Sequence, residues 1–349
     1  MSTRTMLAAK AQGMRISAEP MPVPEPGPGE ARVRVRACGV CGSDLHLLHL
    51  GLLPRNGAPG HEITGEVDAL GDGVAGVAPG DTVVVEPLDT CGRCAPCGAG
   101  RDSICPDAQL FGMHRPGGMA EYLVVPAKRL FAVPRDLDAR LAALAEPVAV
   151  ALHGLRRGGF ERGQRVLVLG AGSVGLVSVL AARWLGAEDV RISARYPRQA
   201  EVARHLGATR VLTEDEATPA ALAGAARRDG VELVLETVGG TADTLRSAVA
   251  ALVPGGTVSV LGLFTGAVSV DAFPLLLKEA TLAWSNCYAR AAAGGPARAD
   301  FEDAVDLLCA ERERASRLLT HAVPLAEVER AFAIASDKKT GAIKVSVVP

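Results

Sequence analysis

Four cysteines lie in one short window of the sequence: Cys91, Cys94, Cys97 and Cys105. Four closely spaced thiolates can surround one Zn²⁺ ion, which is tetrahedral and closed to substrate in structural sites. An iron–sulfur cluster is the rival interpretation, because Pro106 and the close spacing of the first three cysteines also fit a ferredoxin-type run, but the seven-residue gap argues against it. Unmetallated thiols are the plainer alternative. We therefore expect a structural zinc lobe at 89–106 that takes no part in chemistry.

A second set of metal-binding side chains occurs earlier in the chain. Cys41 begins a Cys-Gly-Ser-Asp motif, and His61 is followed directly by Glu62. A catalytic zinc needs three protein ligands and one open position, where it acts as a Lewis acid on an alcohol or carbonyl oxygen. Cys41 and His61 supply two ligands, and either Glu62 or Glu146 supplies the third. A small core cysteine and a hydrogen-bonded turn histidine would explain these residues singly, but not together.

A glycine motif marks a third site. The apolar run 165–169 leads into Gly-Ala-Gly-Ser-Val-Gly, and an apolar helical pattern follows at 176–185. G-x-G-x-x-G between a strand and a helix predicts a dinucleotide site in which the pyrophosphate rests on the helix N-terminus. The alternative is an ordinary glycine-rich turn. The expected contacts are Gly170, Gly172, Ser173, Val174 and Gly175.

The residues after the next strand indicate which dinucleotide binds. An NAD site should carry an acidic residue at the end of the strand 190–193, where a carboxylate accepts from the ribose 2′-hydroxyl. This chain has Ala194 there, with Ser193 before it and Arg195 and Arg198 after it. An arginine fork binds a 2′-phosphate, whereas a carboxylate repels it. We expect NADP(H) to be preferred over NAD(H), unless these arginines are merely solvated.

The secondary-structure pattern of the elements that must position these residues changes near Glu146. Before it, short β-like runs at 31–36, 82–85 and 122–125 alternate with Gly/Pro turns, and the Val/Arg alternation of 31–36 predicts a half-buried strand with its arginines in water. After it, a helical stretch at 147–155 precedes apolar strands at 165–169, 190–193, 231–236 and 257–261, with helical stretches such as 199–206 between them. Such alternation predicts a parallel sheet covered on both faces. A helix at 301–309 and a β-like run at 342–348 close the chain.

Taken together, these motifs resemble the zinc-containing alcohol dehydrogenases of the medium-chain dehydrogenase/reductase superfamily. The resemblance rests on Cys41-Gly42-Ser43-Asp44, on Gly60-His61-Glu62-x2-Gly65-x5-Gly71-x2-Val74, on the four-cysteine spacing, and on Glu146-Pro147 and the run 320–325, all in family order. It is closest to the sorbitol and threonine dehydrogenase branch. It implies an α/β protein with a mainly β GroES-like catalytic domain at 1–147, a Rossmann doubly wound parallel-sheet cofactor domain at 148–284, and a return to the catalytic domain at 285–349.

The resemblance also implies an activity and roles for particular residues. A hydride would pass between the nicotinamide cofactor and an alcohol or polyol, or its ketone or aldehyde, with the substrate oxygen on the catalytic zinc and the nicotinamide in the cleft between the domains. The preference for NADP(H) expected from the residues after the second strand departs from the usual cofactor of sorbitol-type relatives. Ser43 would touch that oxygen, and His46 would pass the proton to solvent. One alternative is a zinc-independent quinone or enone reductase of the same fold, which would lack the Cys41 and His61 ligands. A non-catalytic cofactor-binding protein is the other.

Composition and charge indicate which classes of partner this protein is expected to bind. The 349 residues have a formal net charge of -2, which provides no basic surface for nucleic acid or acidic lipid. The uncharged stretches 166–182 and 247–270 are broken by glycine and proline, so buried strands explain them better than membrane spans, and the first residues show no secretory signal. We expect a cytoplasmic protein with a small-molecule substrate, no nucleic-acid or membrane partner, and a homodimeric or homotetrameric state expected only from the family.

Overall fold

The computed structural model describes residues 4–54, 57–290 and 298–349. Its chain divides into two compact units. The first contains the described residues of Met1–Glu146, Ala289–Arg312 and Leu319–Pro349, and the second contains Pro147–Tyr288 and Glu313–Leu318. None of the helices in the described ranges combines the length and the apolar character that crossing a bilayer requires.

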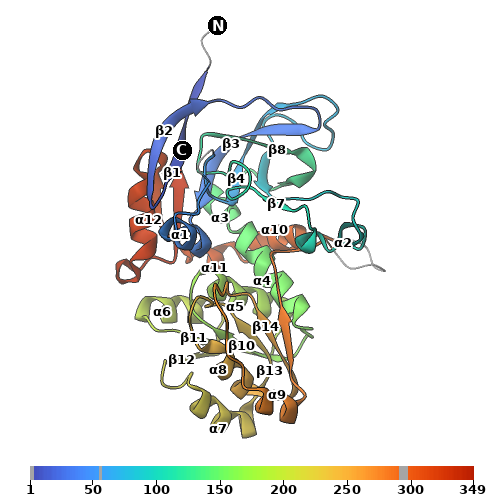
Figure 1. The fold of residues 1–349 in the computed structure, drawn as a ribbon, viewed down its shortest axis with the longest axis vertical. Helices are drawn as coiled ribbons and strands as arrows, with labels where there is room; N and C mark the ends of the chain where they lie inside the picture. The colour runs from blue at the N-terminus through green and yellow to red at the C-terminus, as the bar shows by residue number, and fades with distance from the viewer. Residues whose placement is uncertain (1–3, 55–56, 291–297) are drawn as a thin grey trace. The chain divides into compact units, whose positions relative to one another are not determined.

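The first unit is built on a seven-stranded sheet with the order β16-β17-β3-β4-β5-β9, in which β8 also pairs with β3. Strands β3, β4 and β8 of this sheet are labelled in Figure 1. Its strands are β3 (Glu30–Gly39), β4 (Glu62–Leu70), β5 (Thr82–Val85), β8 (Tyr122–Pro126), β9 (Leu130–Ala132), β16 (Leu319–Pro324) and β17 (Lys344–Val348). Within the described residues these strands pair antiparallel, except β16 with β17. A hairpin of β1 (Thr5–Gln12) and β2 (Arg15–Pro22) and a ribbon of β6 (Leu88–Asp89) and β7 (Gln109–Leu110) lie outside this sheet. The expected mainly β architecture is confirmed.

Helices of the first unit are short. They are α1 (Gly42–His49), α2 (Ala95–Gly98), α3 (Ala139–Ala142), α10 (Asp300–Ala310) and α12 (Val328–Ser336), with 3₁₀ turns at Asp102–Ile104, Ala127–Arg129, Leu325–Glu327 and Lys338–Thr340. The helix α12 packs on β2, β16 and β17, and its Phe332 belongs to the same core as the buried valines of the sheet. The C-terminal segment therefore completes the core of the N-terminal strands.

Strand β3 shows how side-chain alternation builds that core. Val33 and Val35 point inward, and two of the three arginines face solvent as expected. Arg32 differs, because only 9% of it is exposed. Its Nε lies 2.6 Å from Asp68 Oδ2 and its Nη1 lies 2.7 Å from Glu25 Oε2. Ion pairing with two carboxylates thus allows an arginine to be buried where the alternation predicted an exposed one.

The second unit contains one parallel sheet with the order β12-β11-β10-β13-β14-β15. Its strands are β10 (Arg165–Leu169), β11 (Asp189–Ser193), β12 (Arg210–Leu212), β13 (Val231–Glu236), β14 (Leu252–Val260) and β15 (Thr281–Trp284). The chain runs outward from β10 to β12 and then crosses back to β13. This reversal between β10 and β13 is the topological switch point of a doubly wound fold, where ligands bind outside the carboxyl ends of the strands.

Helices connect these parallel strands. They are α5 (Ser173–Leu185), α6 (Pro197–His205), α7 (Pro219–Asp229), α8 (Thr244–Ala251) and α9 (Ala272–Lys278). The helix α4 (Ala145–Arg157) precedes β10, and α11 (Arg312–Ser316) comes later in the chain. The pair α5 and α6 packs together, as does the pair α7 and α8. The crossovers from β10 to β12 run in one direction across the sheet, and those from β12 to β15 run in the other. Because such crossovers are right-handed, α5 and α6 lie on one face of the sheet, and α7 and α8 lie on the opposite face.

One strand begins earlier than its sequence indicates. The run Pro254-Gly255-Gly256 reads as a turn, but it lies inside β14, which starts at Leu252. The register shifts here: Val231 pairs with Leu252, whereas Leu233 pairs with Thr257. A bulge in the ladder accommodates the proline and glycines without ending the strand.

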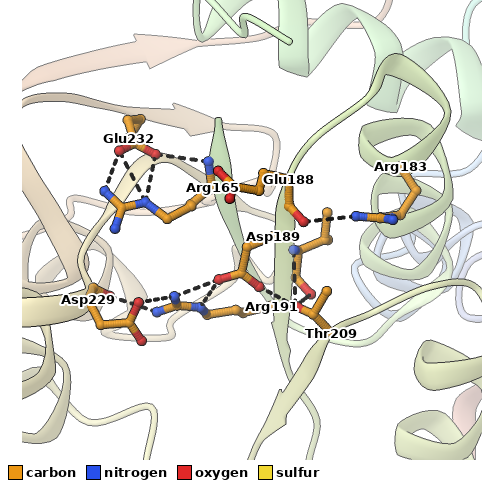
Figure 2. Close-up of polar contacts among 9 residues, drawn as sticks. Arg165, Arg183, Glu188, Asp189, Arg191, Thr209, Asp229 and Glu232 are labelled. Atoms are coloured by element: carbon orange, nitrogen blue, oxygen red, sulfur yellow. Dashed lines mark hydrogen bonds and ion pairs between the residues drawn. The ribbon is translucent and has the colours of Figure 1, made fainter. Parts of the chain in front are cut away.

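The amino ends of the strands are joined by ion pairs (Figure 2). Arg165 at the start of β10 pairs with Glu232, its Nε lying 3.2 Å from both carboxylate oxygens. Arg191 lies between Asp189 and Asp229, and its Nη1 donates to the Asp229 carbonyl at 2.7 Å. These charges are paired with one another at the amino ends of the strands, whereas a doubly wound sheet binds its ligands at the carboxyl ends.

Candidate active site

Strand register brings Cys41 and His61 together. Strands β3 and β4 are antiparallel, and Gly39 at the end of β3 pairs with Glu62 at the start of β4. Cys41 follows β3 as the N-cap of α1, and His61 directly precedes β4. Two motifs that are twenty residues apart in the sequence therefore meet at one edge of the sheet. The ligand atoms of Cys41, His61 and Glu62 all lie within 4.8 Å of one another.

Glu62 is held by a buried lysine. Lys344 Nζ lies 2.6 Å from each Glu62 carboxylate oxygen, and both side chains are 1% exposed. Lys344 begins β17, whose Ser346 pairs with Gly39, so the same sheet positions both charges. Gly39 provides the space, because a Cβ there would lie 1.8 Å from Glu62 Oε2. A buried carboxylate is thus charge-paired while it remains within reach of the ligand cluster.

Asp44 orients the histidine. It is 1% exposed; its Oδ2 accepts from the Cys41 amide at 3.0 Å, and its Oδ1 lies 3.5 Å from His61 Nδ1. Burial opposes a charge on His61, but Asp44 and Cys41 nearby raise the pKa of its imidazole well above the ordinary value. A carboxylate at Nδ1 directs the hydrogen to that nitrogen and leaves Nε2 to bind a metal.

Glu146 and the two relay candidates lie in the same unit. Glu146 is 7% exposed in the first turn of α4, and burial raises the pKa of its carboxyl to about 7, although His61 opposes this shift. It is not among the three residues of the compact cluster. Ser43 and His46 are three positions apart on α1 and so share a helix face. His46 Nε2 is buried and has no hydrogen-bond partner within the described residues.

This donor set fits zinc. A thiolate, an imidazole and a carboxylate are all Zn²⁺ ligands, and three protein ligands with one open position are typical of a catalytic zinc site. The tautomer set by Asp44 and the pairing of Glu62 with Lys344 are the outer contacts that orient metal ligands. Cys41, His61 and Glu62 would hold the ion, which would supply Lewis acidity toward an alcohol or carbonyl oxygen.

The four-cysteine lobe fits a second zinc. Cys94 Sγ lies 3.4 Å from Cys97 Sγ and 3.8 Å from Cys105 Sγ, which in turn lies 3.6 Å from Cys91 Sγ. Four sulfurs at the corners of a tetrahedron about zinc are roughly 3.8 Å apart, from a Zn–S distance of about 2.3 Å. An iron–sulfur cluster would separate the thiolates, since each binds a different part of a multi-iron core. The spacing therefore favours a single ion.

A buried arginine joins this lobe to the sheet. Arg129 is 2% exposed, and its Nη1 lies 2.8 Å from Glu86 Oε2. Its Nη2 lies 2.6 Å from Thr90 Oγ1 and 3.3 Å from Asp102 Oδ2, both within the lobe 89–106. The lobe thus contacts the rest of its unit through charge-assisted bonds, as expected of a structural element.

The glycine motif forms a dinucleotide cradle at the switch point. A Cβ on Gly175 would lie 1.8 Å from the Gly170 carbonyl oxygen, so only glycine permits this close approach of helix and strand. Gly170 has φ +99° and faces Val238. In contrast, a Cβ on Gly172 would meet nothing within 4 Å. Open space at this position, before the N-terminus of the thirteen-residue α5, fits a pyrophosphate.

The residues expected to select the cofactor lie at the carboxyl end of β11. Ser193 Oγ accepts from the Gly170 amide at 2.9 Å, so it fixes the turn of the cradle. Arg195 and Arg198 are each exposed and paired with a glutamate, Arg195 with Glu214 and Arg198 with Glu201. The cations are therefore present, but they already have counter-charges.

Sequence reasoning missed three groups of this site. Asp44 belongs to the quoted Cys-Gly-Ser-Asp motif, but nothing local shows that it faces His61. Lys344 had a usable signal, because it is a lone charge in an otherwise apolar strand pattern. Glu214 had no sequence signal, because it follows β12. The sequence rule that distinguishes NAD from NADP sites considers only the residues at the end of the second strand, β11.

Comparisons with known proteins agree with this geometry. Residues 27–135 match the alcohol dehydrogenase GroES-like domain, and residues 173–310 match the zinc-binding dehydrogenase domain. The chain is 32% identical over 298 residues to 2-dehydro-3-deoxy-L-galactonate 5-dehydrogenase of Pseudoalteromonas atlantica, with 84% of each chain covered. It is 34% identical over 250 residues to L-threonine 3-dehydrogenase of Pyrococcus abyssi, covering 70% of this chain and 71% of that one.

A solved structure extends the likeness to the whole chain. A zinc-binding dehydrogenase from Sinorhizobium meliloti, bound to NADP, superposes with a TM-score of 0.87 at 33% identity, covering 99% of this chain and 100% of that one. The chain belongs to the zinc-containing alcohol dehydrogenase family of medium-chain dehydrogenases/reductases, in the branch that contains threonine and sorbitol dehydrogenases. The expected family, and its GroES-like and Rossmann folds, are confirmed.

Proposed function

We propose that this protein is a zinc-dependent dehydrogenase that transfers a hydride between NADP(H) and an alcohol or polyol, or the corresponding ketone or aldehyde. The observation that carries the proposal is the cluster of Cys41, His61 and Glu62, whose ligand atoms lie within 4.8 Å of one another. A zinc-independent quinone or enone reductase has no use for such a donor set. A non-catalytic protein would not need the buried contacts that orient it.

The chain's own residues have distinct tasks in this proposal. Cys41, His61 and Glu62 bind the metal, and Glu146, whose carboxyl is influenced by the charges of His61 and Glu62, is the second carboxylate of the site. Ser43 receives the proton of the substrate alcohol, and His46, on the same face of α1, passes it to solvent. Asp44 and Lys344 are positioning residues, because they act through His61 and Glu62.

The preference for NADP(H) rests on charge at the end of β11. Ala194 provides no carboxylate for a ribose 2′-hydroxyl, and Arg195 follows it, exposed, with a fork that matches a phosphate. The Sinorhizobium meliloti relative was crystallised with NADP.

We expect kcat/KM to be higher with NADP⁺ than with NAD⁺, because only the former offers a phosphate to these arginines. The measurement is initial rates with both cofactors across polyols, amino alcohols, sugar acids and simple secondary alcohols, and with matching ketones in reverse. Higher kcat/KM with NAD⁺ throughout the panel would refute the cofactor preference. Absence of turnover by a zinc-replete protein on every substrate would favour the non-catalytic alternative.

We also propose that the protein forms a homodimer through the second unit. Strand β15 is an edge of its sheet, and Trp284 on it is 52% exposed. Next to it in sequence, α9 exposes Phe273, Leu276 and Leu277 by 68%, 72% and 66%. An edge strand that carries an exposed tryptophan and follows a helix with exposed apolar side chains fits a second copy of the same edge.

Substituting Leu276 by glutamate should therefore convert the dimer into a monomer in sedimentation velocity experiments. Leu52 in the first unit is 62% exposed and provides the matched control, so L52E should stay dimeric. A monomeric wild-type protein at all concentrations would contradict the proposal.

A further inference from the structure

We infer that Glu214 is a specificity-determining residue that limits the affinity for NADP(H) by competing with the 2′-phosphate for Arg195. This inference rests on the proposed preference for NADP(H). It identifies a residue that sets how much more tightly NADP(H) binds than NAD(H). The three residues from which the sequence predicts the cofactor, Ser193, Arg195 and Arg198, do not show this competition. The competing carboxylate follows the next strand of the sheet.

The sheet places the two side chains together. Strands β11 and β12 are parallel neighbours, with Ser193 paired to Leu212, and the Ala194 amide donates to the Leu212 carbonyl at 3.0 Å. Arg195 and Glu214 each lie two residues beyond this last pair. In a doubly wound fold the adenosine ribose lies at the carboxyl end of the second strand of the unit, which is β11. Glu214 is therefore a carboxylate at the edge of the proposed phosphate site.

The contact occupies one of the two-donor edges of the Arg195 guanidinium, an edge that a phosphate can also use. Arg195 Nε lies 2.7 Å and its terminal nitrogen 2.5 Å from the same oxygen, Glu214 Oε1. Phosphate groups bind arginine through two neighbouring N–H donors of this kind, each donating to a separate phosphate oxygen. A 2′-phosphate and Glu214 cannot both use this edge, so a phosphate that binds to it must displace the carboxylate.

Glu214 also carries a charge that repels the phosphate. Hydrogen bonding to Arg195 lowers the pKa of the Glu214 carboxyl, so it is ionised at neutral pH. The two side chains are 63% and 60% exposed, and solvent therefore screens both the attraction and the repulsion. The effect on affinity should be measurable but moderate. NAD(H) carries no 2′-phosphate, so its affinity should not depend on this competition.

The test compares Glu214→Gln with wild type by calorimetric titration of the zinc-replete protein with NADP⁺ and with NAD⁺. Glutamine keeps the shape and an acceptor oxygen but removes the charge. We expect NADP⁺ to bind about three- to tenfold more tightly and NAD⁺ to bind unchanged. The gain should shrink at high ionic strength, because screening weakens the competition being removed.

Glu216→Gln is the matched control. Glu216 lies two residues further along the same loop and loses the same charge, but it pairs with Arg210 at 2.9 Å, at the opposite end of β12. Its NADP⁺ affinity should equal that of wild type. Arg195→Gln should weaken NADP⁺ binding and leave NAD⁺ binding unchanged.

The outcomes separate the inference from the proposed function. The wild-type ratio of the two affinities tests the NADP preference, and the change of that ratio in Glu214→Gln tests the inference. Unchanged NADP⁺ binding, an equal gain for both cofactors, a loss of NAD⁺ affinity, or the same gain in Glu216→Gln would overturn it. An unaffected NADP⁺ affinity in Arg195→Gln would also overturn it, since Arg195 would then not bind the phosphate.

Discussion

Replacing Cys41 by alanine should lower kcat by at least about 10³-fold, because Lewis-acid stabilisation of the developing charge amounts to several kcal/mol. Cys41 is one of three donors whose ligand atoms lie within 4.8 Å of one another, and two donors hold zinc far less well than three. Cofactor affinity should remain, since the glycine cradle belongs to the second unit and Cys41 to the first.

Metal analysis makes this prediction specific. Wild type should contain about two zinc ions per chain, one for each donor cluster, and Cys41→Ala about one. Cys309→Ala is the matched control, because Cys309 on α10 belongs to neither cluster and its removal should change neither metal content nor turnover. Wild-type activity in Cys41→Ala, or two tightly bound zinc ions in it, would exclude the assigned role.

Replacing Lys344 by methionine should destabilise the first unit of the metal-free protein by about 3–5 kcal/mol, because without zinc it leaves the buried Glu62 carboxylate without its counter-charge. Both side chains are 1% exposed, so solvent cannot take the place of the lysine. Adding Glu62→Gln to Lys344→Met should recover part of the loss, since the uncompensated charge is then gone as well.

The two units allow this loss to be located. Both tryptophans, Trp184 and Trp284, lie in the second unit, so their fluorescence reports on that unit alone. In Lys344→Met, hydrogen exchange in β3, β4 and β17 should accelerate at a lower urea concentration than in wild type. The urea concentration at the midpoint of the tryptophan fluorescence transition should be the same in both proteins. Equal protection of these strands in Lys344→Met and wild type would show that the pair contributes nothing to stability.

Local patterns accounted for the main elements. The expected strands 165–169 and 231–236 coincide with β10 and β13, and the helical pattern at 176–185 lies within α5. These predictions succeeded because apolar periodicity reflects burial on a sheet or helix face, which is a local property. The strand expected at 257–261 begins too late, because Pro254-Gly255-Gly256 is a local turn signal. In the structure, pairing with β13 keeps this segment in β14.

The sequence by itself determined which candidate ligand groups this protein carries, because residue type and spacing are written in the chain: four cysteines in one window, Cys41 with His61, and the glycine motif after β10. Only the tertiary structure decided how those groups are charged and oriented. Lys344 reaches Glu62 across 282 positions, and Glu214 meets Arg195 across neighbouring strands. Such pairs follow from strand register, which the whole sheet fixes through the burial of one face.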